Sequence, residues 1–258
     1  MSASIGLDSH ANHRYEGGYR RDAVHTPGRR SPVLHATLLA RTHELNRDYV
    51  ELLLAEPGSP RLLDTAHALP QKVCDALACV VPAWRAQIAA CPFALYSLRF
   101  DDQQFWNAAL DDFGAELPFG HVPESLERRY GAGSAKPLSS TFCELALFFA
   151  WHTAMTNPVA ARVLFAMPDL LAERLPRVPL WQMRRIALDY PGLLVPRWPN
   201  NPGFWPDLVT FAAACDTHRL ETARLLGSQL IAAELEPTIA PDGKVMRPRV
   251  RPVKVRHE

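Results

Sequence analysis

Apolar residues recur at three- and four-residue intervals along much of the chain, which is the spacing of amphipathic helices. Within 34–56, one such stripe consists of Leu38, Leu45, Tyr49, Leu52 and Leu53. A second stripe follows Asp216, a suitable N-cap, and continues to Glu234. The pattern predicts long helices over 34–56 and 216–234.

Prolines and polar residues predict further helix starts. Thr141 and Glu144 have the spacing of a capping box, which predicts a helix from about 141 to 155. Pro158 and Pro168 stand where a first helical turn tolerates proline, so each indicates a new helix. Extended structure is predicted only for two separate segments, 93–100 and 193–198. The sequence therefore predicts an all-α or mostly α-helical protein.

The second half of the chain repeats parts of the first at an offset of 97 to 99 residues. Four of the six tryptophans fall on matched positions, although coincidence in a proline- and alanine-rich helical protein is the alternative. We predict two similar helical units, 35–115 and 139–236, which pack as a pseudo-twofold dimer and are joined by a linker at 116–138. The matches are Val81-Pro82 with Val178-Pro179, Trp84 with Trp181, Ile88 with Ile186, Arg99 with Arg197, and Phe105-Trp106 with Phe204-Trp205.

The formal net charge of +1 conceals two basic ends. Residues 1–34 carry a net charge of +2 and residues 242–258 carry +4, so the rest of the chain carries −5. Both ends lack apolar periodicity, and we expect flexible basic tails at 1–34 and 237–258. An extended C-terminal tail would place its cations along a phosphate backbone, although a solvated tail, or one docked on the acidic body, is the alternative. Its nucleic-acid-binding candidates are Lys244, Arg247, Arg249, Arg251, Lys254 and Arg256.

Motifs of enzymes and metal sites are absent from the sequence. The five cysteines form no Cys-x-x-Cys pair, and no histidine on a predicted helix has a second histidine four residues later. We expect a non-enzyme without metal or cofactor, in which the cysteines are small buried residues. The N-terminus lacks the pattern of a secretory signal and no apolar run could span a bilayer, so we expect a cytoplasmic protein.

Arg99 and Arg197 occupy matching positions in the two predicted units. In a structural interpretation, each caps helix carbonyls or pairs with an acidic residue such as Asp101 or Asp207. In a functional interpretation, each contacts phosphate or an acidic partner, which makes both of them candidate partner-contact residues. The matched tryptophans and phenylalanines are expected in the core.

Short segments of both units occur in a set order. The first unit contains Glu44-Leu45-Asn46, Tyr49 and Leu98-Arg99-Phe100-Asp101, and the second contains Val178-Pro179, Gln182-Met183 and Arg197-Trp198. In this order they resemble the D subunit of the bacterial flagellar master transcriptional regulator, the FlhD type. The resemblance covers about 40–112 and 143–233. That family is a short chain that forms a homodimer, whereas here two copies follow one another, and the second lacks the Asn and Tyr.

The resemblance implies a helical regulator that acts with a partner. The family's D subunit assembles with a zinc-binding C subunit, and together they activate transcription. An FlhC-like, DNA-binding partner would supply the zinc site, because this chain lacks the four-cysteine ligand set. The alternative is a non-catalytic protein-interaction adaptor or a secretion-system accessory protein, which the same helical body would fit.

Overall fold

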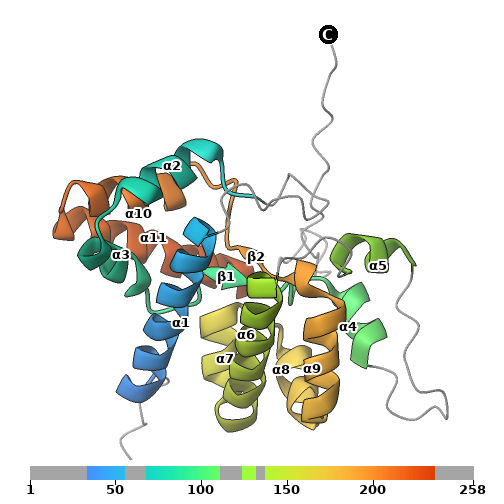
Figure 1. Cartoon of the computed structure of the whole chain (residues 1–258). Coiled ribbons are helices and arrows are strands. Elements are labelled where there is room, and N and C mark those ends of the chain that lie inside the picture. Colours follow the sequence, from blue (N-terminus) through green and yellow to red (C-terminus); the bar gives the residue numbers. More distant parts are fainter. Residues whose placement is uncertain (1–33, 56–67, 111–123, 132–136, 236–258) are drawn as a thin grey trace, which may run out of the picture. The chain divides into compact units, whose positions relative to one another are not determined.

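Helices make up most of the protein (Figure 1). The computed structural model describes residues 34–55, 68–110, 124–131 and 137–235. Of these residues, 76% are helical and 2% lie in strands, so the prediction of a mostly helical protein is confirmed. All of the described residues belong to one compact unit.

The first described element is a long helix that buries the predicted stripe. Leu45 and Tyr49 of this helix are buried, whereas Glu44, Arg47 and Glu51 are exposed. The elements of the first half of the chain are α1 (Ala36–Ala55), α2 (Gln71–Cys79), α3 (Pro82–Ala89), β1 (Tyr96–Ser97), α4 (Gln103–Leu110) and α5 (Glu124–Tyr130). Helix α5 lies within 116–138, the stretch that the sequence assigns to a linker.

The second half also begins with a 20-residue helix. This helix starts at Pro137, four residues before Thr141, so the predicted capping box is wrong: proline suits a first helical position, and Thr141 lies inside the helix. The elements are α6 (Pro137–Thr156), α7 (Pro158–Phe165), α8 (Asp169–Arg174), the 3-10 turn η3 (Leu175–Arg177), α9 (Leu180–Asp189), the 3-10 turn η4 (Pro191–Leu193), β2 (Val195–Pro196), α10 (Phe204–Ala213) and α11 (Thr217–Leu235).

Side-chain caps fix two of the predicted helix starts. The side chain of Asn157 accepts a hydrogen bond from the Ala160 N–H at 3.0 Å, just before Pro158 opens α7. The Asp216 carboxylate accepts one from the Arg219 N–H at 3.0 Å at the start of α11. Each cap satisfies a backbone donor that has no partner within the helix.

The two short strands pair with each other. β1 and β2 are antiparallel, with Ser97 opposite Val195 and Tyr96 opposite Pro196. The N–H of Arg197 also donates to the carbonyl of Leu95 at 3.0 Å. The sequence predicts the two extended segments as isolated, which is wrong, because strands far apart in the chain meet here.

Helices from the two halves of the chain pack against one another. α1 packs on α3, and α6 stands between α7 and α9 (Figure 1). α10, from the second half, packs on α2 and α3 from the first, and α11 lies along α10. Phe204 and Trp205 of α10 are fully buried in this core. The Cα of Gly227 on α11 lies so close to the rings of Phe93 and Phe204 that a Cβ atom would collide with them.

Candidate functional site

Each half of the chain carries an arginine whose backbone is held by a tryptophan. The indole Nε1 of Trp106 donates to the carbonyl of Arg99 at 2.9 Å. The indole Nε1 of Trp205 donates to the carbonyl of Arg197 at 2.6 Å. Both tryptophans belong to Phe-Trp pairs, one on α4 and one on α10. The two corners therefore share one hydrogen-bond arrangement, although the chain between arginine and tryptophan is one residue longer in the second.

The side chain of Arg197 is used inside the protein. It is 3% exposed, donates from Nη1 to the Leu164 carbonyl at 3.0 Å, and forms an ion pair from Nη2 with Glu234 at 3.1 Å. Its guanidinium lies 4.6 Å from the ring centroid of Trp198, whose Nε1 donates to the other Glu234 oxygen at 2.5 Å. Burial lowers the pKa of Arg197, and the Glu234 carboxylate opposes this effect. These contacts match the structural interpretation of Arg197. Its acidic partner, however, is Glu234 and not the expected Asp207.

Arg99 is only partly buried. Its backbone has φ of 54°, in the left-handed region, and its N–H donates to Ser97 Oγ at 3.1 Å. Within the described segments, its buried Nε has no hydrogen-bond partner. Because this nitrogen is buried, it is not a donor at the surface; Arg99 is nevertheless the more exposed of the two candidate partner-contact residues, since Arg197 is 3% exposed.

A tyrosine and an aspartate form a short contact next to this corner. The Tyr130 hydroxyl donates to Asp102 Oδ2 at 2.6 Å, and Asp102 Oδ1 accepts from the Phe105 N–H at 3.0 Å. Arg129 lies 3.8 Å from the same carboxylate. Burial, and then the Asp102 carboxylate, raise the pKa of Tyr130 to about 12. Tyr130 is thus a protonated donor at neutral pH that joins α5 to the start of α4.

Asn46 ties α1 to the chain that leads into β1. Its Nδ2 donates to the carbonyls of Ala89, Cys91 and Phe93 at 3.1, 3.3 and 2.8 Å, and its Oδ1 accepts from the Leu95 N–H at 2.9 Å. The side chain is fully buried. A short amide that supplies both donors and an acceptor is suited to this bend, because buried backbone groups need partners.

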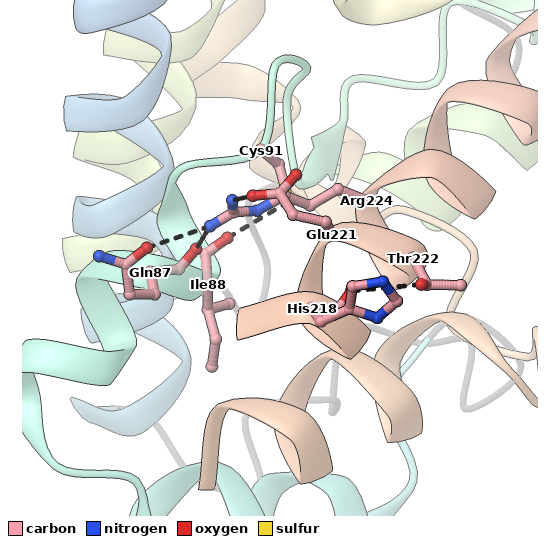
Figure 2. Close-up of polar contacts among 7 residues, drawn as sticks. All are labelled: Gln87, Ile88, Cys91, His218, Glu221, Thr222 and Arg224. Carbon is pink, nitrogen blue, oxygen red and sulfur yellow. Dashed lines mark hydrogen bonds and ion pairs between the residues drawn. The ribbon is translucent and has the colours of Figure 1, made fainter. Parts of the chain in front are cut away.

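Arg224 joins α11 to the first half of the chain (Figure 2). Its Nη2 donates to the backbone carbonyl of Gln87 near the end of α3, and its Nη1 pairs with Glu221 on α11. The Cys91 thiol is hydrogen-bonded to the carbonyl of Ile88 at 3.3 Å. Burial raises the pKa of Cys91 to about 12, although Arg224 acts in the opposite direction. The thiol therefore stays protonated at neutral pH, and it is a poor nucleophile.

The acidic residues, histidines and cysteines of the described segments form no metal-binding cluster. Among them, no group of three or more His, Cys, Asp or Glu side chains could hold a metal ion. Cys91 and Cys143 are buried as expected, but Cys79 and Cys215 are exposed, so the prediction of buried cysteines is wrong for these two. None of the helices in the described ranges is long and apolar enough to cross a membrane.

The matched aromatic residues differ in their exposure. Phe105 and Trp106 of α4 are buried, like their counterparts on α10, as expected for core residues. Trp181 on α9 is 62% exposed, so the core prediction is wrong there. Its counterpart Trp84 is partly buried against the core. Leu188, two turns later on the same helix, is also exposed, and the charged Arg184 and Arg185 lie between them.

The six cations of the predicted C-terminal nucleic-acid site lie outside the described residues. The structure therefore places only Arg99 and Arg197 among the predicted site residues, on the two segments that β1 and β2 bring together. Sequence reasoning missed Tyr130 and Arg224. No motif marks them, because their partners lie 28 and 137 residues away along the chain.

Comparison with known proteins gives no family for this chain. No family model matches it, no curated protein matches it and no solved structure matches it. The resemblance to the FlhD type therefore depends on the short segments quoted above.

Proposed function

We propose that the protein is a transcriptional regulator built from two fused FlhD-like units, which acts with a partner subunit. The observation that supports the two units most directly is the tryptophan-to-arginine hydrogen bond, which occurs once in each half at matched sequence positions. The same donor, the same acceptor and a helix with a Phe-Trp pair recur in both halves, which favours a repeat over a chance similarity of composition.

The pairing of β1 with β2 supports a pseudo-twofold relation between the units. Antiparallel neighbours are related by a local twofold axis, and Ser97 faces Val195, a residue 98 positions later, within the offset of the sequence repeat. The two strands come from equivalent places in the two units. A fused pseudo-dimer would have this pairing at its centre.

Exchange of packing between the halves supports the same arrangement. α10 packs on α2 and α3 of the first unit. In the other direction, Gln182 on α9 donates to the carbonyl of Ala109 on α4 at 2.8 Å, and Arg174 on α8 donates to Asn107 on α4 at 2.8 Å. The helix that carries each Phe-Trp pair thus contacts the opposite unit, so neither unit is complete alone.

The role in transcription comes from the resemblance. One of the residues that carries it, Asn46, has a defined structural role in the bend between α3 and β1. We propose that DNA contact is made by the FlhC-like partner and by the C-terminal tail, and that this chain is not an enzyme and works in the cytoplasm. Arg99, whose side chain is partly exposed, is the candidate contact to the partner.

Salt-dependent DNA binding tests the tail. We expect the full chain, mixed with its co-purifying partner, to bind its promoter with a steep salt dependence, because six tail cations could give a log-log slope of up to about −5. A variant with Arg247, Arg249 and Arg251 changed to glutamine should lose about half of the tail's contribution to the slope. The matched lysine variant, which keeps the charge, should retain it. Equal salt slopes for all three proteins would refute a DNA-binding tail.

The second candidate is a protein-interaction adaptor without a role in transcription. The exposed apolar residues of α6 and α9 favour it, because such surfaces mark contacts between proteins. Transcript measurements after deletion of the gene distinguish the two. A regulator changes the transcripts of specific promoters, whereas an adaptor leaves their initiation unchanged.

A further inference from the structure

An exposed, uncharged stripe follows the whole length of α6. Its members are three or four residues apart in strict alternation, which is the spacing of the a and d positions of a heptad seam. Leu138 is 56% exposed, and Leu145 and Met155 are each 47% exposed. Phe148 is partly buried, and Thr141 and His152 are exposed. The seam is Leu138, Thr141, Leu145, Phe148, His152 and Met155.

The corresponding face of α1 has the opposite character. Both helices have 20 residues, and their solvent-facing sides can be compared. Where α6 has Leu145 and Phe148 in its seam, α1 has exposed Glu44 and Arg47. The helix face that α1 exposes to solvent is charged. Because the exposed face of α6 is uncharged, we infer that another surface covers it.

The order of apolar and polar side chains in the seam is the same in both directions. If two α6 helices lie antiparallel about the midpoint between Leu145 and Phe148, these two residues face each other across the pair. Leu138 then faces Met155, and Thr141 faces His152. Every apolar position meets an apolar position, and the only two polar positions of the seam meet each other.

The charges next to the seam do not oppose contact between identical surfaces. Glu144 on α6 pairs with Arg184 on α9 at 3.1 Å, and Arg185 pairs with Asp189 at 3.0 Å. Each of these ion pairs is neutral, so two copies would meet without a net like-charge repulsion. Because these ion pairs are internally balanced, they leave little net charge beside the seam that would attract a different, oppositely charged partner.

The exposed area is sufficient for a weak dimer. The half-exposed aliphatic residues of the seam and its partly exposed Phe148 together expose roughly 300 Å² of apolar surface. Because a typical interface is about 57% apolar, this corresponds to roughly 500 Å² per copy, near the small end of specific interfaces. A contact of this size favours reversible association.

We propose that the α6 seam binds the α6 seam of a second copy of this chain, antiparallel and about a twofold axis between Leu145 and Phe148. A twofold contact needs only one surface, provided that this surface is complementary to itself. The inference does not depend on a role in transcription, since it concerns only described residues of α6. Its occupant is a second copy, and a helix of a different protein is the competing outcome.

Sedimentation equilibrium of the full chain tests whether the seam associates. We expect a monomer–dimer equilibrium in the micromolar range that 0.5 M salt does not weaken, because the seam is uncharged. Leu145→Glu should raise the dimer dissociation constant at least about 100-fold, since two carboxylates would be buried near the axis. The matched control is Leu225→Glu on α11, a leucine that is 59% exposed outside the seam, and it should leave the constant unchanged.

Two outcomes of that measurement would overturn the proposal. If the wild-type protein stays monomeric at the highest soluble concentration, the seam does not bind a second copy, and its partner is a different protein. Equal effects of the two substitutions on association would place any dimer contact elsewhere. Circular dichroism of both variants shows whether Leu145→Glu still folds.

Charge substitution at the two polar positions tests the antiparallel register without touching an apolar side chain. In the double variant Thr141→Glu with His152→Lys, opposite charges face each other twice in an antiparallel dimer. In Thr141→Lys with His152→Lys, like charges face each other twice. We expect the first variant to associate at least roughly 10-fold more tightly than the second in low salt, and the difference to shrink in 0.5 M salt. Equal constants, or tighter association of the Lys/Lys variant, would refute the register.

Discussion

Replacement of Asn46 by leucine, which has a similar size, should strongly destabilise the protein. The leucine side chain cannot supply the donor that reaches the carbonyls of Ala89, Cys91 and Phe93, nor the acceptor for the Leu95 N–H. Since Asn46 is fully buried, water does not replace these partners without opening the corner.

The size of the effect follows from the groups that lose a partner. A buried donor or acceptor left without a hydrogen bond costs about 1–3 kcal/mol. The Leu95 N–H loses its acceptor, and the Phe93 carbonyl loses its shortest side-chain donor, at 2.8 Å. We therefore expect Asn46→Leu to lower the free energy of unfolding by about 2–5 kcal/mol. For a domain of this size, that corresponds to a fall in melting temperature of about 10 °C.

Urea unfolding followed by circular dichroism measures this loss, and Thr42→Val is the matched control. Thr42 is also buried on α1, but its hydroxyl donates to the carbonyl of Leu38 at 2.9 Å, which the helix already pairs. The control should therefore cost less than about 1 kcal/mol. If Asn46→Leu costs no more than Thr42→Val, the role assigned to the carboxamide is wrong.

Three further changes have defined expected outcomes. Arg197→Met should lower the free energy of unfolding by about 2–4 kcal/mol in urea titrations, because the Leu164 carbonyl and Glu234 lose a buried charged donor; a loss below 1 kcal/mol would contradict this. Gly227→Ala should lower the melting temperature rather than raise it, because the new methyl group meets two phenylalanine rings. Burial, followed by Arg224 and Arg47, lowers the pKa of His43 below 6.5. The unfolded chain therefore binds more protons, and stability should fall as pH drops below about 6.5, less steeply in His43→Gln; parallel pH profiles would contradict the shift.

Local signals in the sequence predicted much of the helical structure. The apolar stripe of α1, the Asn157 cap before Pro158 and the Asp216 cap of α11 involve residues within one or two turns of each other. Such contacts depend on the chain's immediate neighbours. The start of α6 was less predictable, because both Pro137 and Thr141 are acceptable first residues and the packing of α6 against α9 favours the longer helix.

The features that the sequence did not predict depend on contacts between residues far apart in the chain. The pairing of β1 with β2 could not be predicted, because the sequence does not show that the two halves of the chain meet. The ion pair of Arg197 with Glu234 was missed for the same reason, since Glu234 lies at the far end of α11. Trp181 was expected in the core because tryptophan usually packs there, and its exposure follows from the position of α9 at the surface.

The signature residues Asn46 and Tyr49 show why the two units differ. Both are buried on α1, where Asn46 supports the bend before β1 and Tyr49 packs against Tyr96 at 5.4 Å between ring centroids. α6 contains neither asparagine nor tyrosine. The Asn46 carboxamide therefore has no counterpart on α6.

Promoter occupancy in the native cell tests the proposed function most directly. A tagged full-length chain should be enriched at specific promoters in chromatin immunoprecipitation, together with a zinc-containing partner. Transcripts from those promoters should change when the gene is deleted, and truncation of 242–258 should reduce the enrichment. If no promoter is enriched over an untagged control, and transcripts are unchanged by the deletion, the protein is not a transcriptional regulator.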